Sequence, residues 1–135
     1  MKSPKIFYFK KFRKKSGKLL PISFNKKFPI KVKRIFFIYG KKNYKRGDHA
    51  HKKCSQVFFA IKGKIKINMK YKNTNKSVFL DYNRSKALLV PPKIWSRVDF
   101  LDNQSVALVL TDYEYDFKDY IETYEEFLAF QKRNK

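Results

Sequence analysis

Although the chain has 135 residues and a formal net charge of +22 at pH 7, its 43% hydrophobic and 18% aromatic content argues against intrinsic disorder and predicts a single domain, residues 1–135. No apolar run approaches the roughly 20 residues of a membrane-spanning helix, and no hydrophobic signal-peptide segment follows the basic N-terminus, so we expect no membrane association. The single cysteine, Cys54, excludes an internal disulfide and predicts a reducing, cytoplasmic location.

The first half of the chain contains short segments rich in β-branched and aromatic residues, which favour strands. They cover residues 6–9, 19–24 and 32–39. A polar loop is expected at residues 40–47, and the segment after it holds the only two histidines, His49 and His51. On a strand, positions i and i+2 face the same side, so the two imidazoles should project side by side.

The second half continues this pattern. Residues 55–61 predict a buried strand, Gly63 predicts a hairpin turn, and residues 64–71 alternate polar and apolar side chains, as a half-buried strand does. Further strands are expected at residues 77–80, 87–90, 94–100 and 106–110. So many short strands separated by turns indicate an all-β barrel or sandwich. Thr123 and Glu126 have the spacing of a capping box and predict a short C-terminal helix.

The histidine segment resembles the first motif of the cupins, which are small β-barrels of the jelly-roll type. The motif is carried by His49-x-His51, by Gln56 after four residues, and by Gly63 after six more. In metal-binding cupins a glutamate stands where this chain has Gln56, and a second motif adds another histidine. Because both are missing, we expect no metal and no other cofactor, although a carboxylate from elsewhere would be able to complete a metal site.

A narrower resemblance is to the sugar 3,4-ketoisomerases, cupins that act on nucleotide-linked 4-keto-6-deoxy sugars. Their signature is similar to Arg46-Gly47-x-His49-Ala50-His51-Lys52-Lys53 followed by Gln56. Three further blocks agree in the same order: residues 33–38, 90–95 and 108–127. The resemblance covers about residues 32–127 and implies a cupin jelly-roll barrel with a short C-terminal helix.

This resemblance implies that the substrate is dTDP-4-keto-6-deoxyglucose, whose carbonyl moves from C4 to C3 through an enediol(ate). The product would be a 3-keto sugar for dideoxyaminosugar and surface-glycan biosynthesis. We assign His49 as the base at C3, because a neutral imidazole suits this role near pH 7, and His51 as its partner in proton relay or in binding the sugar oxygens. The candidate substrate-binding residues are Arg34, Arg46, Lys53, Gln56, Trp95, Arg97 and Tyr39.

Some positions depart from the family. Phe36 and Phe37 stand where relatives often carry tyrosines, so a hydroxyl contact would come from elsewhere, such as Tyr39. Glu122 stands where a basic residue is common, and we expect it at the surface or at a dimer contact. We interpret the stretch from Tyr113 to Tyr124 as structural packing. The configuration of the 3-keto product, galacto or gluco, stays open.

Two other functions stay open. One is a non-catalytic cupin that binds nucleotide sugars. The other is a basic nucleic-acid-binding β-barrel, which the pI of about 10.1 would suit; we rank it lower because the lysines are spread along the chain. We expect a homodimer, and the N-terminal strands are candidates for exchange between its subunits.

Overall fold

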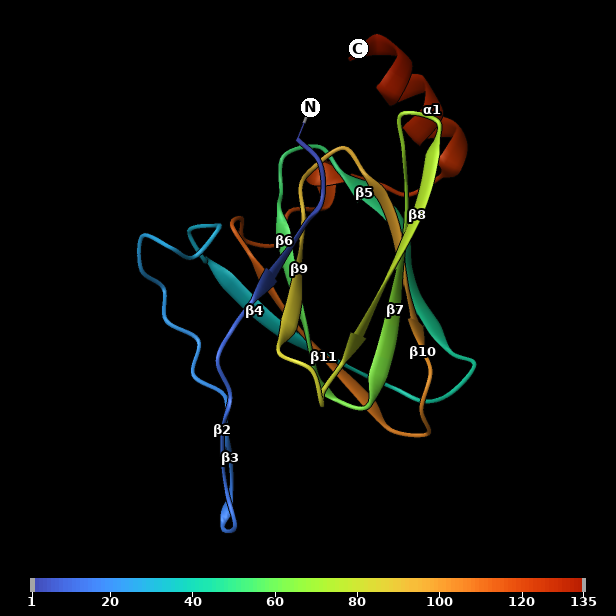
Figure 1. Ribbon diagram of the computed structural model, residues 1–135. Coiled ribbons are helices and arrows are strands. Elements are labelled where there is room, and N and C mark those ends of the chain that lie inside the picture. The colour runs from blue at the N-terminus through green and yellow to red at the C-terminus, as the bar shows by residue number, and fades with distance from the viewer. Residues whose placement is uncertain (1, 135) are drawn as a thin grey trace.

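In the computed structural model, which describes residues 2–134, two antiparallel sheets form the walls of a barrel (Figure 1). The first sheet contains, in spatial order, β1 (Lys5–Tyr8), β9 (Lys86–Val90), β6 (Gln56–Lys62), β11 (Ser105–Thr111) and β4 (Arg34–Gly40). The second contains β12 (Tyr120–Ile121), β5 (Lys45–His51), β10 (Trp95–Phe100), β7 (Lys64–Tyr71) and β8 (Thr74–Asp81). The predicted all-β barrel is therefore confirmed.

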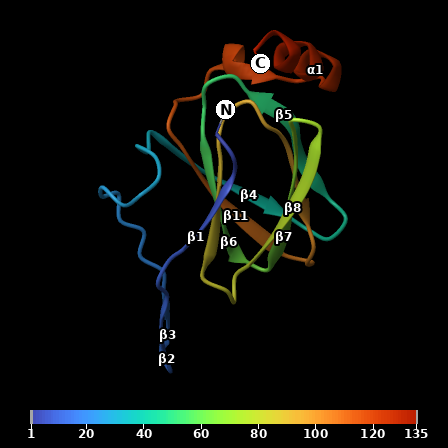
Figure 2. The same ribbon diagram turned by 45° about the horizontal axis from the view of Figure 1, so that its top comes forward.

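The elements outside the two sheets lie at the ends of the chain (Figure 2). They are the hairpin of β2 (Phe12–Lys14) and β3 (Gly17–Leu19), the 3-10 helix η1 (Phe117–Asp119) and the helix α1 (Tyr124–Arg133). As predicted, Thr123 caps α1, and its side chain accepts a hydrogen bond from the backbone N–H of Glu126 at 3.2 Å. Among residues 2–134, no helix is both long enough and apolar enough to cross a bilayer.

Strand β7 and the turn before it show how local sequence determines these elements. β7 spans the predicted residues 64–71, and Ile65, Ile67 and Met69 are buried while their polar neighbours face outward. Gly63 lies in the turn between β6 and β7, has a positive φ of 68°, and a Cβ added there would lie 2.8 Å from the Gln104 carbonyl oxygen. The turn therefore requires glycine. The predicted turn is present, but the predicted hairpin is wrong, because β6 and β7 belong to different sheets and do not pair.

Three apolar clusters pack around the two sheets. The largest fills part of the barrel between the sheets and includes Phe58, Leu80, Leu88, Ile94, Phe100 and Val109. The second covers the outer face of the first sheet, where Phe7, Phe28 and Val32 pack against buried residues such as Phe59 and Leu110. The third joins α1 to the outer face of the second sheet through Ala50, Trp95, Ile121 and Phe127. Neither covering cluster closes the space between β4 and β5.

Two predictions about the first half were wrong. Residues 20–33 contain no strand; the chain instead forms the hairpin at residues 12–19 and then runs irregularly over the first sheet. The polar loop after β4 is shorter than expected, because β5 begins at Lys45. Pairing of β5 with β10 extends the strand through polar residues, for which local composition gives little indication.

Candidate active site

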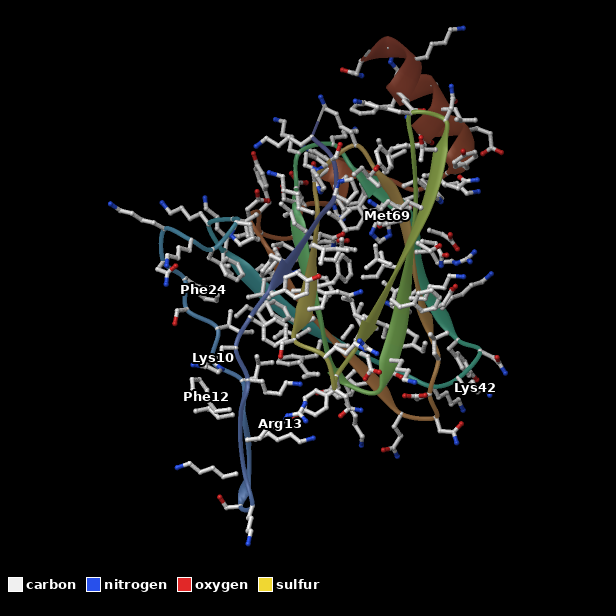
Figure 3. The ribbon with its side chains drawn as sticks, in the orientation of Figure 1. Lys10, Phe12, Arg13, Phe24, Lys42 and Met69 are labelled. Carbon is white, nitrogen blue, oxygen red and sulfur yellow. The ribbon has the colours of Figure 1, made fainter. Side chains whose placement is uncertain are left out.

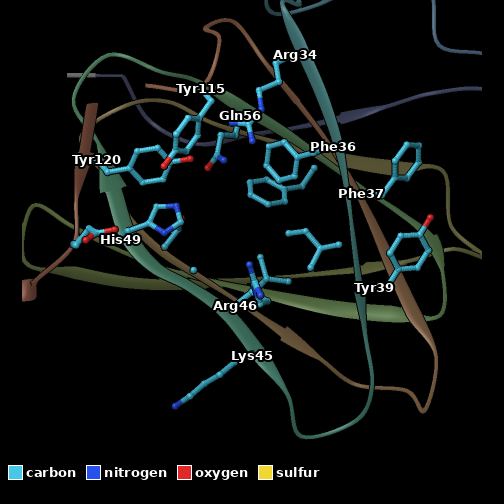
Figure 4. Close-up of a pocket in the computed structure, with 16 residues that line it drawn as sticks. Arg34, Phe36, Phe37, Tyr39, Lys45, Arg46, His49, Gln56, Tyr115 and Tyr120 are labelled. Atoms are coloured by element: carbon cyan, nitrogen blue, oxygen red, sulfur yellow. The ribbon is translucent and has the colours of Figure 1, made fainter. Parts of the chain in front are cut away.

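A cavity of about 710 Å³ opens inside the barrel between β4 and β5 (Figure 4). Its polar wall residues come from both sheets and from the segment after β11, and they are Arg34, Lys45, Arg46, His49, Gln56, Ser96 and Glu122. Aromatic residues complete the wall, among them Phe36, Phe58, Tyr115 and Tyr120. The cavity combines one histidine, several cations and an apolar lining, as expected for a site that binds an anionic small molecule.

A β-bulge in β5 places Arg46 and His49 on the same side of the strand. His49 lies opposite Ser96 and Arg46 lies opposite Val98, while Asp48 is the extra residue between them, with a φ of 60°. Ser96 and Val98 both line the cavity, so their partners on β5 face it too. Without the bulge, an odd spacing of three residues would send Arg46 to the opposite face from His49.

Gly47 belongs to this bulge, and any other residue at this position would strain the backbone. Its φ is +101°, and a Cβ at this position would lie 3.0 Å from the carbonyl oxygen of Ser96 and 3.3 Å from Cα of Arg97. An L side chain would therefore meet backbone atoms of β10 that cannot move without breaking the strand pairing.

The two imidazoles lie side by side, as predicted, but in different surroundings. Their ring centroids are 5.0 Å apart and the ring planes are nearly perpendicular, at 87°. His49 faces the cavity, whereas His51 is only 6% exposed and lies outside the cavity wall. The Nδ1 atom of His51 lies 2.9 Å from Oδ2 of Asp119.

Both imidazoles are held in the uncharged form near neutral pH. Burial is the main cause that lowers the pKa of His49, to about 4, and the neighbouring His51 adds to the effect. A hydrogen bond with the Gly47 backbone opposes this shift only in part. Burial also lowers the pKa of His51, while the hydrogen bond and the charge of Asp119 act in the opposite direction. A neutral His49 is able to accept a proton from a bound molecule.

The segment between β11 and α1, interpreted above as structural packing, contributes directly to the site. The Tyr120 ring lies 5.0 Å from that of His49 and 4.4 Å from that of His51, and Tyr115 lies 5.7 Å from Tyr120. β12 pairs with β5, which places Tyr120 opposite His51. Sequence reasoning missed this long-range pairing, and the C-terminal block of the family resemblance was its only signal.

Two arginines line opposite parts of the cavity. Arg34 comes from β4, with its guanidinium 4.7 Å from the Phe36 ring centroid and 5.2 Å from that of Tyr115. Arg46 comes from β5 on the other side (Figure 4). Gln56, which begins β6, is buried between these walls. The structure thus brings together His49, Arg34, Arg46 and Gln56 of the predicted site.

Trp95 and Arg97 do not reach the cavity, which corrects their predicted contact with substrate. Successive residues of a strand face opposite sides, and because Ser96 faces the cavity, its two neighbours face outward. The Trp95 ring packs against α1, 5.8 Å from the Phe127 ring. The Arg97 guanidinium pairs with Asp99 at 2.9 Å on the outer surface.

Lys53 and Tyr39 also lie away from the site's interior. Lys53 is exposed in the turn after β5, and it contacts Asp119 only through its backbone N–H, at 2.7 Å. Tyr39 borders the cavity mouth but is 77% exposed, with its ring across β4 from Phe36 (Figure 4). Tyr115 and Tyr120 are therefore the tyrosines on the side of His49. Glu122, expected at the surface, is exposed and also borders the cavity.

Within residues 2–134, one group of three metal-type donors lies together: His51, Cys54 and Asp119, with ligand atoms within 4.8 Å of one another. Burial is the main cause that raises the pKa of Cys54 to about 12, so its thiol is protonated near neutral pH. Both carboxylate oxygens of Asp119 already accept hydrogen bonds. These residues do not fit a metal ion.

Comparisons of the sequence with known proteins identify relatives of this chain. The model of the family described as "FdtA: WxcM-like, C-terminal" matches residues 2–132. The TDP-4-oxo-6-deoxy-alpha-D-glucose-3,4-oxoisomerase of Aneurinibacillus thermoaerophilus is 33% identical over 124 residues, 91% of this chain and 88% of that protein.

Solved structures show the same fold. A mutant of the 3,4-ketoisomerase QdtA from Thermoanaerobacterium thermosaccharolyticum, in complex with TDP-4-keto-6-deoxyglucose, superposes with a TM-score of 0.88 at 30% identity, covering 96% of this chain and 94% of that one. WlaRA, a TDP-fucose-3,4-ketoisomerase from Campylobacter jejuni, gives a TM-score of 0.84 at 30% identity, with 96% of both chains covered. The predicted cupin-type barrel is confirmed.

Proposed function

The chain belongs to the FdtA family of WxcM-like proteins, and we propose that it is a sugar 3,4-ketoisomerase that acts on TDP-4-keto-6-deoxyglucose. The observation that carries this proposal is His49, a neutral imidazole in the wall of a cavity that arginines also line. The match in sequence and fold to proteins named for this reaction supplies the substrate. The protein is accordingly an isomerase that moves a carbonyl from C4 to C3.

The reaction needs two proton transfers, and His49 is placed for the first. Its neutral imidazole removes the proton from C3 of the 4-keto sugar, and the electrons of the C3–H bond form a C3–C4 double bond as O4 becomes an enediolate. A proton then returns to C4, O3 loses its proton as the new carbonyl forms at C3, and O4 gains one. The atoms balance without an oxidant or a reductant.

Cationic groups are needed both for the enediolate and for the diphosphate. Arg34 and Arg46 line the cavity and are the candidates, because a guanidinium offers paired donors to oxyanions. Gln56 is buried in the same wall and can donate or accept a hydrogen bond with a sugar hydroxyl. Tyr120, next to His49, is a further candidate for contact with the sugar.

This function is tested by proton NMR of the purified protein with TDP-4-keto-6-deoxyglucose in D2O and EDTA, beside a His49→Asn variant. We expect the carbonyl to appear at C3, deuterium to enter at C4, and the variant to lose turnover. Binding of the sugar by the wild type without any conversion would instead indicate a non-catalytic nucleotide-sugar-binding protein. The coupling constants of the product would give its configuration.

We also propose that the enzyme is a homodimer of the cytoplasm. β4 is an edge strand of the first sheet, and its outward residues Ile35, Phe37 and Tyr39 are 49%, 49% and 77% exposed. A long apolar edge strand is an open site for pairing with another chain. The β2–β3 hairpin extends from the barrel with Phe12 exposed near its base (Figure 3), and these features together support a second copy as the partner. The buried free thiol of Cys54 is consistent with a reducing compartment.

Analytical ultracentrifugation tests the dimer through a Phe37→Glu variant and its control, Phe79→Glu. Phe79 is similarly exposed, at 55%, but lies on β8 at the edge of the other sheet. We expect only the Phe37 variant to dissociate, because it places a charge in the apolar edge of β4. A monomeric wild type, or equal behaviour of both variants, would contradict this assignment.

A further inference from the structure

Asp119 is the most highly connected carboxylate near the site, although it does not line the cavity. Its Oδ2 atom lies 2.9 Å from Nδ1 of His51 and also accepts the backbone N–H of Cys54 at 3.3 Å. Its Oδ1 atom accepts the backbone N–H of Lys53 at 2.7 Å. The backbone carbonyl of Asp119 accepts the N–H of Lys52 at 2.9 Å. The residue therefore binds the whole turn that follows His51.

These bonds determine which nitrogen of His51 carries the proton. A carboxylate only accepts hydrogen bonds, so Nδ1 must be the donor, and the neutral ring then has no proton on Nε2. Nε2 is fully buried and has no hydrogen-bond partner among residues 2–134. A buried acceptor without a partner is costly, and such a group in a site is a candidate for use during the reaction.

His51 is positioned to act through His49 rather than on the substrate. It lies outside the cavity wall, while its ring contacts those of His49 and Tyr120, at centroid distances of 5.0 Å and 4.4 Å. After His49 has taken the C3 proton, it is an imidazolium in a site whose burial disfavours that charge. A proton passed to Nε2 of His51 would rest on a ring paired with the carboxylate of Asp119.

We infer that Asp119 is a positioning residue of the isomerisation, which fixes the proton of His51 at Nδ1 and leaves Nε2 as the acceptor beside His49. This inference deepens the proposed function and rests on it. The transfer is balanced: the N–H bond of protonated His49 breaks, an N–H bond forms at Nε2 of His51, and the reverse transfer returns a proton to His49.

Nitrogen-15 NMR of the histidine rings in the substrate-free wild type tests the tautomer directly. The expected spectrum has His51 protonated at Nδ1 and unprotonated at Nε2 at pH 7. A ring protonated at Nε2 would overturn the inference. Because this measurement needs neither a variant nor turnover, it decides the tautomer even if the wild type fails to convert TDP-4-keto-6-deoxyglucose, a failure that would count only against the proposed function.

Kinetics of Asp119→Ala, with Asp112→Ala as a matched control, test the consequence. Asp112 likewise accepts a backbone N–H, from Ser55 at 2.7 Å, but it forms no hydrogen bond to a histidine. For Asp119→Ala we expect kcat to fall about 10- to 100-fold, the range found when a residue that orients a functional side chain through a hydrogen bond is removed. Its KM should change less than about twofold. Its His51 signal should show protonation at Nε2. An equal loss of kcat in both variants, or an unchanged His51 tautomer in Asp119→Ala, would contradict the inference. Asp119 would then only stabilise the turn that follows His51.

Discussion

The uncharged state of His49 makes a quantitative prediction about stability that does not depend on turnover. In the folded protein its pKa falls from 6.5 to about 4, chiefly because the ring is buried. At 1.36 kcal/mol for each pKa unit, the fold disfavours the imidazolium by about 3 kcal/mol. Between pH 6.5 and pH 4 the unfolded chain therefore binds a proton at His49 that the folded chain does not bind.

The sign and window of the effect follow from this difference. The unfolded state binds more protons between pH 6.5 and 4, so the free energy of unfolding falls as the pH falls through that window and levels off below it. Between pH 7 and pH 5, the part due to His49 amounts to about 2 kcal/mol. A His49→Asn variant lacks the titrating ring and should lose about 2 kcal/mol less over this interval than the wild type.

Urea unfolding at pH 7 and pH 5 measures the difference for both proteins. His51 is retained in both, so the difference between the two proteins reports the titration of His49 together with its coupling to His51. In kinetics, because His49 stays neutral down to about pH 4, its protonation should cause no decline of kcat/KM near pH 6.5. If the wild type and the variant lose the same free energy to within about 0.5 kcal/mol, the ring is not desolvated as described.

Three further changes test other parts of the site. Gly47→Ala should lower the free energy of unfolding by about 1–3 kcal/mol, because its φ is positive and its Cβ meets the Ser96 carbonyl; urea curves that match the wild type would contradict this. Arg46→Gln should weaken TDP binding by about 1.5–3 kcal/mol in calorimetry, while Arg97→Gln on the outer surface should leave it unchanged. Equal losses in both variants would contradict the conclusion that the β5 bulge turns Arg46 into the cavity. Trp95→Ala should lower the free energy of unfolding by about 3–5 kcal/mol with little change in KM. A large rise in KM without loss of stability would indicate that the ring contacts the substrate.

Local sequence predicted those features that depend on near neighbours. The alternation at residues 64–71 gave β7 with its bounds, Thr123 gave the start of α1, and the i, i+2 spacing put His49 and His51 together. Each of these features depends on the alternation of side chains along a strand or on a helix cap within a few residues, so no information about the fold was needed.

The remaining parts of the site depend on pairing between distant strands. Arg46 faces the cavity only because Asp48 is an extra residue opposite β10. Asp119 reaches His51 across 68 residues, since β12 adds to the edge of β5. Trp95 matched a family block, but a motif does not say which face of β10 is the interior. Bulges and long-range register are set by the whole sheet, and the local pattern does not specify them.

The fate of the hydrogen on C3 tests the central claim, that His49 is the base, most directly. TDP-4-keto-6-deoxyglucose carrying deuterium at C3 would be incubated with the wild type and with His49→Asn, and the label followed by NMR. We expect the wild type to remove deuterium from C3 as the carbonyl moves, and the variant to bind the sugar with its label intact. Loss of the label at the same rate in both proteins would show that another group removes the proton, and the account of this site would be wrong.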